Sequence, residues 1–146
     1  MRIAIGSDEA TPLTAWVVEE VRRRGHEVVL FGALREGDDP AWPKVAWKVG
    51  QAVASGECEQ GILFCWTGTG VSMAANKVPG VRAALCTDAP TAAGARRWND
   101  ANVLCMSLRL TAPAVAQEIL DAWFSAQPDP SEQANIAWLK GMEGGG

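Results

Sequence analysis

The segment CWTGTGVS, residues 65–72, places one thiol, three hydroxyl groups and two glycines in a short stretch of chain. The apolar run GILFC that ends at Cys65 predicts a buried strand, and the glycines predict a turn that leads into a helix near Gly70. Backbone N–H groups of residues 67–72 would then form a cradle for an anion. A phosphate or a developing enediolate would suit such a cradle.

The thiol of Cys65 stands directly before this turn. The positive end of a helix favours a thiolate, so Cys65 could act as a base or as a nucleophile. The alternative is a buried structural cysteine, because Cys86 and Cys105 end their predicted strands in the same way. The four cysteines include no C-x-x-C pair, and the one histidine, His26, lies far along the chain from them. We therefore expect no metal, disulfide or cofactor.

Two nucleotide-binding motifs fit this segment poorly. A dinucleotide fingerprint would need a third glycine where the chain has Met73, and it would follow the first strand of the fold. A phosphate-binding loop of the Walker type would end in G-K-[ST], which is absent. Only the general anion cradle remains.

Short apolar runs alternate with longer helical patterns along the whole chain. This alternation predicts an α/β fold with a five-stranded parallel sheet whose strands are covered on both faces. The expected strands are residues 2–6, 27–32, 61–65, 82–86 and 102–106.

Helix signals fill the segments between these strands. Thr11 and Pro12 predict a capped helix that ends before Gly25, and further helices are expected from about residue 42 to 56, from 70 to before 79, from 90 to 97 and from 111 onward. A terminal helix, capped by Ser131, carries apolar residues that need a surface to pack on, and a second copy of the chain could supply it. We expect one domain over residues 1–142 and a flexible tail at 143–146. Five tryptophans are expected mostly in the core: Trp16, Trp42, Trp47, Trp123 and Trp138.

Polar and reactive residues follow four of the five predicted strands. Parallel strands end at one edge of their sheet, where ligands of open α/β sheets bind. Convergence at this edge indicates a site, although loop residues are polar in any case. The residues concerned are Ser7, Asp8 and Glu9, then Cys65 to Ser72, Cys86 to Asp88, and Ser107 to Arg109.

Composition narrows the possible partners. The chain of 146 residues has a formal net charge of −4 and is 48% hydrophobic, and its Lys and Arg residues are scattered. A nucleic-acid partner is therefore not expected. No apolar run approaches the length of a membrane span, and the start MRIAIGSD is unlike a signal peptide, so the expected location is the cytoplasm.

Three segments together resemble one known family. GILFCWTGTGVSMAANKVPGVRAALC, WNDANVL and IAIGSDEA are similar in sequence and order to type B ribose-5-phosphate isomerases and galactose-6-phosphate isomerase subunits. The similarity runs through about residues 1–125. The resemblance implies a Rossmann-like three-layer αβα sandwich, no metal, and aldose–ketose isomerisation through an enediol. It also implies a homodimer, with tetramers possible, with sites between subunits and the C-terminal helix at the interface.

Positions that match the family's motifs take on expected roles. The resemblance implies that Cys65 is the base that moves a proton between C1 and C2, and that the loop from Thr67 holds the enediolate. The residues expected to take part in catalysis are Cys65, Thr67, Asp8 and Glu9. Those expected to bind substrate are Ser7, Trp66, Gly68, Thr69, Gly70, Val71, Ser72, Trp98, Asn99 and Arg109.

Four departures from the family's pattern change this expectation. Glu9 and Trp98 stand where the family has histidines, and Trp66 stands where it has a glycine. The C-terminal segment that supplies phosphate-binding arginines is replaced by residues 128–141, which contain no arginine. Weaker phosphate binding follows. The tryptophans could contact the C–H face of a sugar or merely fill space.

In the family that this chain resembles, the histidine at the position of Trp98 opens the sugar ring. Its replacement leaves two possibilities. Ring opening could pass to Asp8 or Glu9, whose carboxyl pKa would rise on burial. Alternatively the substrate has no ring to open, as with a tetrose phosphate or a linear sugar. The competing hypothesis is a sugar- or small-molecule-binding protein that kept this fold and lost turnover.

Overall fold

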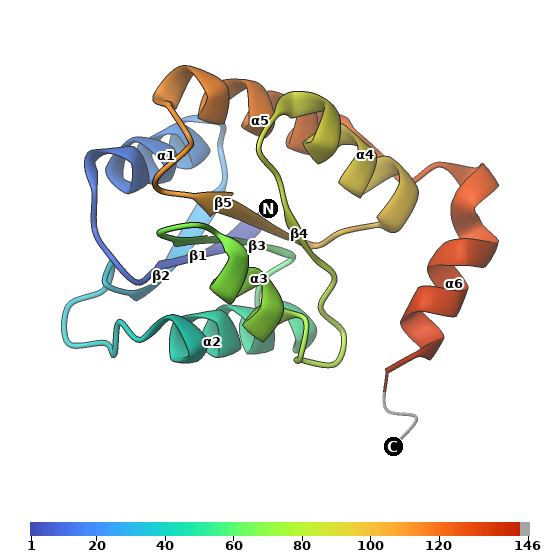
Figure 1. Cartoon of the computed structure of the whole chain (residues 1–146), viewed down its shortest axis with the longest axis horizontal. Helices are drawn as coiled ribbons and strands as arrows, with labels where there is room; N and C mark the ends of the chain where they lie inside the picture. Colours follow the sequence, from blue (N-terminus) through green and yellow to red (C-terminus); the bar gives the residue numbers. More distant parts are fainter. Residues whose placement is uncertain (144–146) are drawn as a thin grey trace.

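The computed structural model describes residues 1–143, and five parallel strands form its central layer (Figure 1). The strands lie in the order β2-β1-β3-β5-β4, so β3 is at the centre of the sheet. The predicted parallel sheet is confirmed. The strands are β1 (Arg2–Ser7), β2 (Glu27–Gly32), β3 (Gln60–Cys65), β4 (Ala83–Leu85) and β5 (Val103–Ser107).

Helices cover both faces of the sheet and complete the expected three-layer sandwich. One face is covered by α1, α4 and α5, and the opposite face by α2 and α3, as Figure 1 shows. A sixth helix, α6, extends beyond the end of α4. The helices are α1 (Pro12–Arg23), α2 (Trp42–Ala54), α3 (Thr69–Ala75), α4 (Ala89–Asn99), α5 (Pro113–Ser125) and α6 (Gln133–Gly141).

The central strand explains why two separate cores form. Side chains alternate between the two faces of a strand, and every residue of β3 is buried. Ile62 and Phe64 pack under α1 and α5, whereas Leu63 and Cys65 pack under α2 and α3. The thiol of Cys65 therefore belongs to the α2–α3 side of the sheet.

The C-terminal segment differs from its prediction at the start of α6. Ser131 does not cap this helix: it lies in a short 3-10 helix, and Asp129 accepts a hydrogen bond from the Ser131 N–H at 2.9 Å. Pro130 favours this arrangement because it fixes the first turn directly after Asp129. Along α6, Ile136 is buried but Trp138 is 75% exposed. The expected tail at 143–146 lies almost wholly outside the described residues.

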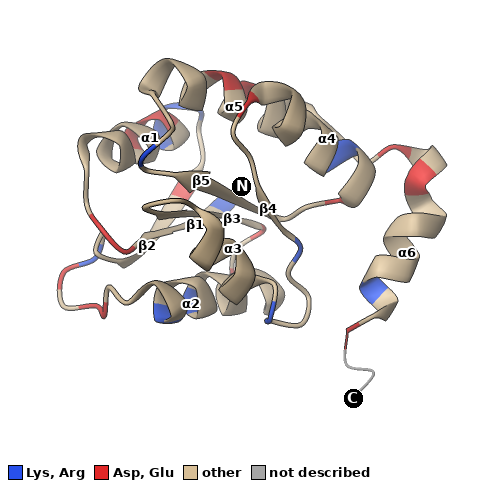
Figure 2. Ribbon diagram, in the orientation of Figure 1, with Lys and Arg blue, Asp and Glu red and all other residues tan. Residues whose placement is uncertain are grey.

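Charged residues are spread over the fold without a continuous basic stripe (Figure 2). Within residues 1–143 no group of three or more His, Cys, Asp or Glu side chains could hold a metal ion. None of the helices in the described part of the chain has the length and apolar character needed to cross a bilayer.

Candidate active site

The carboxyl ends of three neighbouring strands bring most of the predicted site residues together. Cys65 ends β3 at the centre of the sheet and pairs in register with Ser107 at the end of β5. On its other side, Ser7 of β1 pairs with Phe64, so Asp8 follows beside Cys65. Adjacent strands lie about 4.8 Å apart. Cys65, Asp8 and the turn after β5 therefore lie at the same edge of the sheet.

Exposure separates Cys65 from the other three cysteines. Cys65 is 5% exposed, whereas Cys58, Cys86 and Cys105 are fully buried. Burial raises the pKa of the Cys86 thiol to about 12 and also raises the pKa of the Cys58 and Cys105 thiols, so these three stay protonated at neutral pH. Cys65 is therefore the one cysteine of the four with any exposed surface.

The turn after Cys65 has the geometry of a tight strand-to-helix connection. Gly68 adopts a left-handed conformation with φ of +78° and immediately precedes α3, which begins at Thr69. The hydroxyls of Thr67 and Thr69 lie 2.6 Å apart and are exposed. Val71 is fully buried, so only its backbone could face a ligand. Ser72 is half-buried on α3.

One residue beside this turn was missed by sequence reasoning. Trp42, the first residue of α2, covers Gly70: a Cβ at Gly70 would lie 3.0 Å from the indole carbon Cε3. Trp42 is 43% exposed, so it forms an accessible wall beside the turn. No local sequence signal connects positions so far apart in the chain.

The turn after β1 is held by Ser7. Its buried hydroxyl donates to the Glu9 carbonyl at 2.6 Å and accepts from the Glu9 N–H at 3.2 Å. Ser7 therefore fixes the local backbone, while the side chain of Glu9 is exposed.

Asp8 carries an unsatisfied carboxyl oxygen. Its Oδ1 is buried and has no hydrogen-bond partner among residues 1–143. Burial, with a smaller contribution from the charge of Glu9, raises the pKa of Asp8 above its ordinary value. An unpartnered carboxyl next to Cys65 is suited to exchange a proton with a bound ligand.

Replacing Asp8 with asparagine should stabilise the protein at neutral pH. The pKa of Asp8 is raised in the folded state, so the wild type is most stable below the unfolded-state pKa, where Asp8 is protonated. This stability is lost as pH rises through the folded-state pKa, and asparagine does not titrate in this way. Urea unfolding should show the stability of Asp8→Asn over the wild type increasing as pH rises above 3.8, the ordinary pKa of an aspartate. Isomerase activity should fall in the same variant. A stability difference independent of pH would contradict this assignment.

Trp66 and Arg109 lie next to each other across two strands. The Arg109 N–H donates to the Trp66 carbonyl at 3.0 Å, and both side chains are exposed. The backbone of Arg109 is thus hydrogen-bonded to the turn that follows Cys65.

The backbones of Trp98 and Asn99 lie away from this edge within one chain, although the folded-back Trp98 side chain lines a cavity with Leu85 at the end of β4. They end α4, which runs back from the end of β4 to the start of β5 and so reaches the opposite edge of the sheet. Trp98 folds back over Gly94 of its own helix. Asn99 lines a cavity together with Arg82 and Ala83 at the start of β4.

Comparison with known proteins identifies the family. The sequence profile described as Ribose/Galactose Isomerase matches residues 3–137. The chain belongs to the ribose/galactose isomerase family. The predicted resemblance is confirmed.

Relatives in the ribose/galactose isomerase family are similar over most of their length. The chain is 37% identical to D-erythrulose-4-phosphate isomerase of Pectobacterium atrosepticum, covering 87% of this chain and 84% of that protein. It is 39% identical to ribose-5-phosphate isomerase B of Escherichia coli, and the match covers 86% of this chain and 85% of that protein. The solved structure of Clostridium thermocellum ribose-5-phosphate isomerase B superposes with a TM-score of 0.89 at 38% identity. The match covers 98% of this chain and 97% of that chain.

Proposed function

We propose that this chain is an aldose–ketose isomerase that acts on sugar phosphates of the pentose or tetrose class through an enediol intermediate. The observation that carries this proposal is the position of Cys65. It is the one cysteine of the four with any exposed surface, it ends the central strand, and the turn that follows it lies within residues 3–137, which match the family profile.

The proposed steps keep protons and charge balanced. The Cys65 thiolate removes the proton from C2 of the open-chain aldose, and the electron pair forms the C1–C2 double bond while O1 becomes negative. Backbone N–H groups of the turn from Thr67 donate to O1. Asp8 or Glu9 exchanges protons with the hydroxyl oxygens, and the Cys65 thiol returns its proton to C1 to give the ketose. Arg109 binds the distal group of the substrate.

The position of His26 supports a substrate that is easily used in its open-chain form. His26 stacks on Phe124 with ring centroids 4.7 Å apart and contacts the amino group of Met1 at 3.0 Å, both at the amino edge of the sheet. It is therefore not available for ring opening beside Cys65. A four-carbon sugar phosphate has no favourable ring to open, and a relative that is 37% identical is named for a four-carbon ketose phosphate.

A panel of substrates tests the proposed function. Ribose, allose, galactose and tetrose phosphates are each incubated with the enzyme in deuterated water, beside their unphosphorylated forms. Interconversion of aldose and ketose with deuterium incorporation supports the proposal. Binding without turnover would instead support a sugar-binding protein that has lost catalysis.

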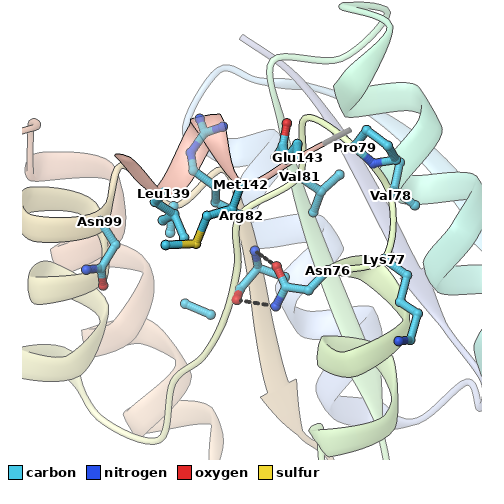
Figure 3. A pocket seen from close by; sticks show the side chains of 13 residues that line it. Asn76, Lys77, Val78, Pro79, Val81, Arg82, Asn99, Leu139, Met142 and Glu143 are labelled. Carbon is cyan, nitrogen blue, oxygen red and sulfur yellow. Dashed lines mark hydrogen bonds between the residues drawn. The ribbon is translucent and has the colours of Figure 1, made fainter. Parts of the chain in front are cut away.

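A second copy of the chain would complete the proposed site. Asn99 and Trp98 lie at the β4 side of the fold, away from the Cys65 of their own chain. Next to Asn99 is a cavity of about 510 Å³ between α6 and the edge of the sheet (Figure 3). Leu139 of α6 and Met142 directly after it line this cavity, and Trp138 of α6 is exposed nearby. Exposed apolar residues of this kind typically mark a protein interface, and a homodimer is the proposed assembly.

Mixing two inactive variants tests this shared site. Cys65→Ala and Asn99→Ala should each be strongly impaired alone, because each removes one half of the site. After joint refolding, half of the dimers would be mixed and each would hold one intact site, so about a quarter of wild-type activity should return. As a control, the two variants are mixed at several ratios, and the recovered activity should follow the fraction of mixed dimers. No recovery, with mixed dimers present, would mean that Asn99 acts within its own chain.

A further inference from the structure

The peptide group between Trp66 and Thr67 is held by two hydrogen bonds from the turn after β5. The carbonyl oxygen of Trp66 accepts from the Ser107 hydroxyl at 2.9 Å and from the Arg109 N–H at 3.0 Å. The preceding carbonyl, that of Cys65, accepts from the Leu108 N–H at 3.0 Å. The two residues at the centre of the proposed site are thus fixed by a segment that lies about forty positions further along the chain.

Ser107 joins these contacts into one unit. It is 1% exposed, it pairs in register with Cys65, and its hydroxyl also accepts from the Leu110 N–H at 3.1 Å. The hydroxyl therefore links the Trp66 carbonyl to the end of the turn. Buried hydrogen bonds that are satisfied on both sides make a backbone segment rigid.

This arrangement sets the direction of one N–H group. Residues 1–143 contain no cis peptide bond, and in a trans peptide the C=O and the N–H point in opposite directions. Because the Trp66 carbonyl points at Ser107, the N–H of Thr67 points away from the turn after β5. Within residues 1–143 it has no hydrogen-bond acceptor, and Thr67 itself is exposed.

We propose that Ser107 is a positioning residue that aligns the Thr67 N–H as a donor to the enediolate oxygen. This inference rests on the proposed isomerase function and adds a residue that does not touch the substrate. The donor matters most when negative charge develops on oxygen, and loss of one oriented donor commonly lowers kcat by roughly 10²-fold or more. Loss of orientation alone should cost less than loss of the donor.

Replacing Ser107 with alanine removes the hydroxyl and leaves the Arg109 contact in place. We expect Ser107→Ala to lower kcat by roughly 10- to 100-fold, while KM changes by no more than about twofold. Ser55→Ala is the matched control: the Ser55 hydroxyl also donates to a carbonyl, that of Ala52 at 3.2 Å, and also accepts from a backbone N–H, that of Glu57 at 3.3 Å. Ser55 follows α2 at the opposite edge of the sheet and should leave kcat unchanged.

Two inhibitors separate positioning from general damage to the site. A sugar-derived hydroxamate phosphate carries a charged, planar group like the enediolate, whereas the corresponding polyol phosphate carries none. Ser107→Ala should lower the affinity for the hydroxamate by about the same factor as it lowers kcat. The affinity for the polyol phosphate should stay unchanged. Ser107→Thr, which keeps the hydroxyl, should restore both kcat and hydroxamate affinity. If Ser107→Ala does not fold, Ser107→Cys replaces it, since a thiol of similar size is a weak donor.

The outcomes are distinct from those of the function test. If wild-type protein isomerises no member of the substrate panel, the proposed function fails and this inference fails with it. If the wild type is active and Ser107→Ala keeps full kcat, or loses hydroxamate and polyol affinity equally, only the positioning role of Ser107 is overturned.

Discussion

Replacing Cys65 with serine is expected to lower the rate of solvent-proton exchange at C2 of the substrate by roughly 10³-fold. A serine hydroxyl is uncharged at neutral pH and needs a neighbouring base to act as one, and the only histidine lies at the opposite edge of the sheet. Cys65→Ala should behave in the same way. Deuterium incorporation into the sugar phosphate, followed by nuclear magnetic resonance, measures the effect directly.

The matched control removes a different thiol. Cys58 is fully buried just before β3, at the amino edge of the sheet, and burial raises its pKa. Cys58→Ala should therefore lower stability without changing exchange. Undiminished exchange in Cys65→Ser would show that another group takes the C2 proton, with Asp8 as the next candidate because of its unpartnered Oδ1.

Local patterns were sufficient to predict the sheet. β2 was predicted with its observed bounds, and the other strands were predicted to within a residue at each end, because continuous apolar runs flanked by glycine and polar residues leave little ambiguity. The start of α1 was also predictable, since Thr11 and Thr14 form a reciprocal cap. These features are determined by residues that are close together in the chain, so the sequence alone is enough to predict them.

Contacts between distant segments were not predictable in this way. The hydrogen bond from Ser107 to Trp66 and the packing of Trp42 on Gly70 each join parts of the chain that no periodicity relates. The position of Asn99 is more instructive. A motif shared with a family predicts a role in the site, but a helix that crosses between parallel strands returns its end to the opposite edge, so the motif does not say which copy uses the residue.

The exposed tryptophans contradict their sequence-based prediction. Trp123 is buried, but Trp42, Trp47 and Trp138 are 43%, 50% and 75% exposed, so the expectation that they lie mostly in the core is wrong. Large apolar side chains at helical spacing indicate a face that needs covering. They do not distinguish the core of one chain from a surface that a ligand or another copy covers.

The turn after Cys65 should not tolerate a side chain at Gly68. Gly68 has φ of +78°, a left-handed conformation that costs other residues roughly 1 kcal/mol or more. An added Cβ would also lie 2.5 Å from Leu85 Cδ1 and 3.0 Å from the backbone carbon of Met106. The end of a leucine side chain can move, but the backbone of β5 is held by the sheet. The turn itself must shift, and a shift of about 1 Å at reacting groups can lower activity by about 10²-fold.

Gly68→Ala should therefore lower kcat by about 10²-fold, the upper end of the range expected for Ser107→Ala, because it moves the whole turn that carries the Thr67 N–H. Gly25→Ala is the control for backbone strain: Gly25 has φ of +93°, but an added Cβ there would meet nothing within 4 Å. Both variants should lose stability through φ strain in urea unfolding, Gly68→Ala should lose more because of its added contacts, and only Gly68→Ala should lose activity. Full activity in a folded Gly68→Ala would mean that the turn is not the anion cradle, since a cradle displaced from the β3 edge could no longer meet the oxygen of a sugar bound at Cys65.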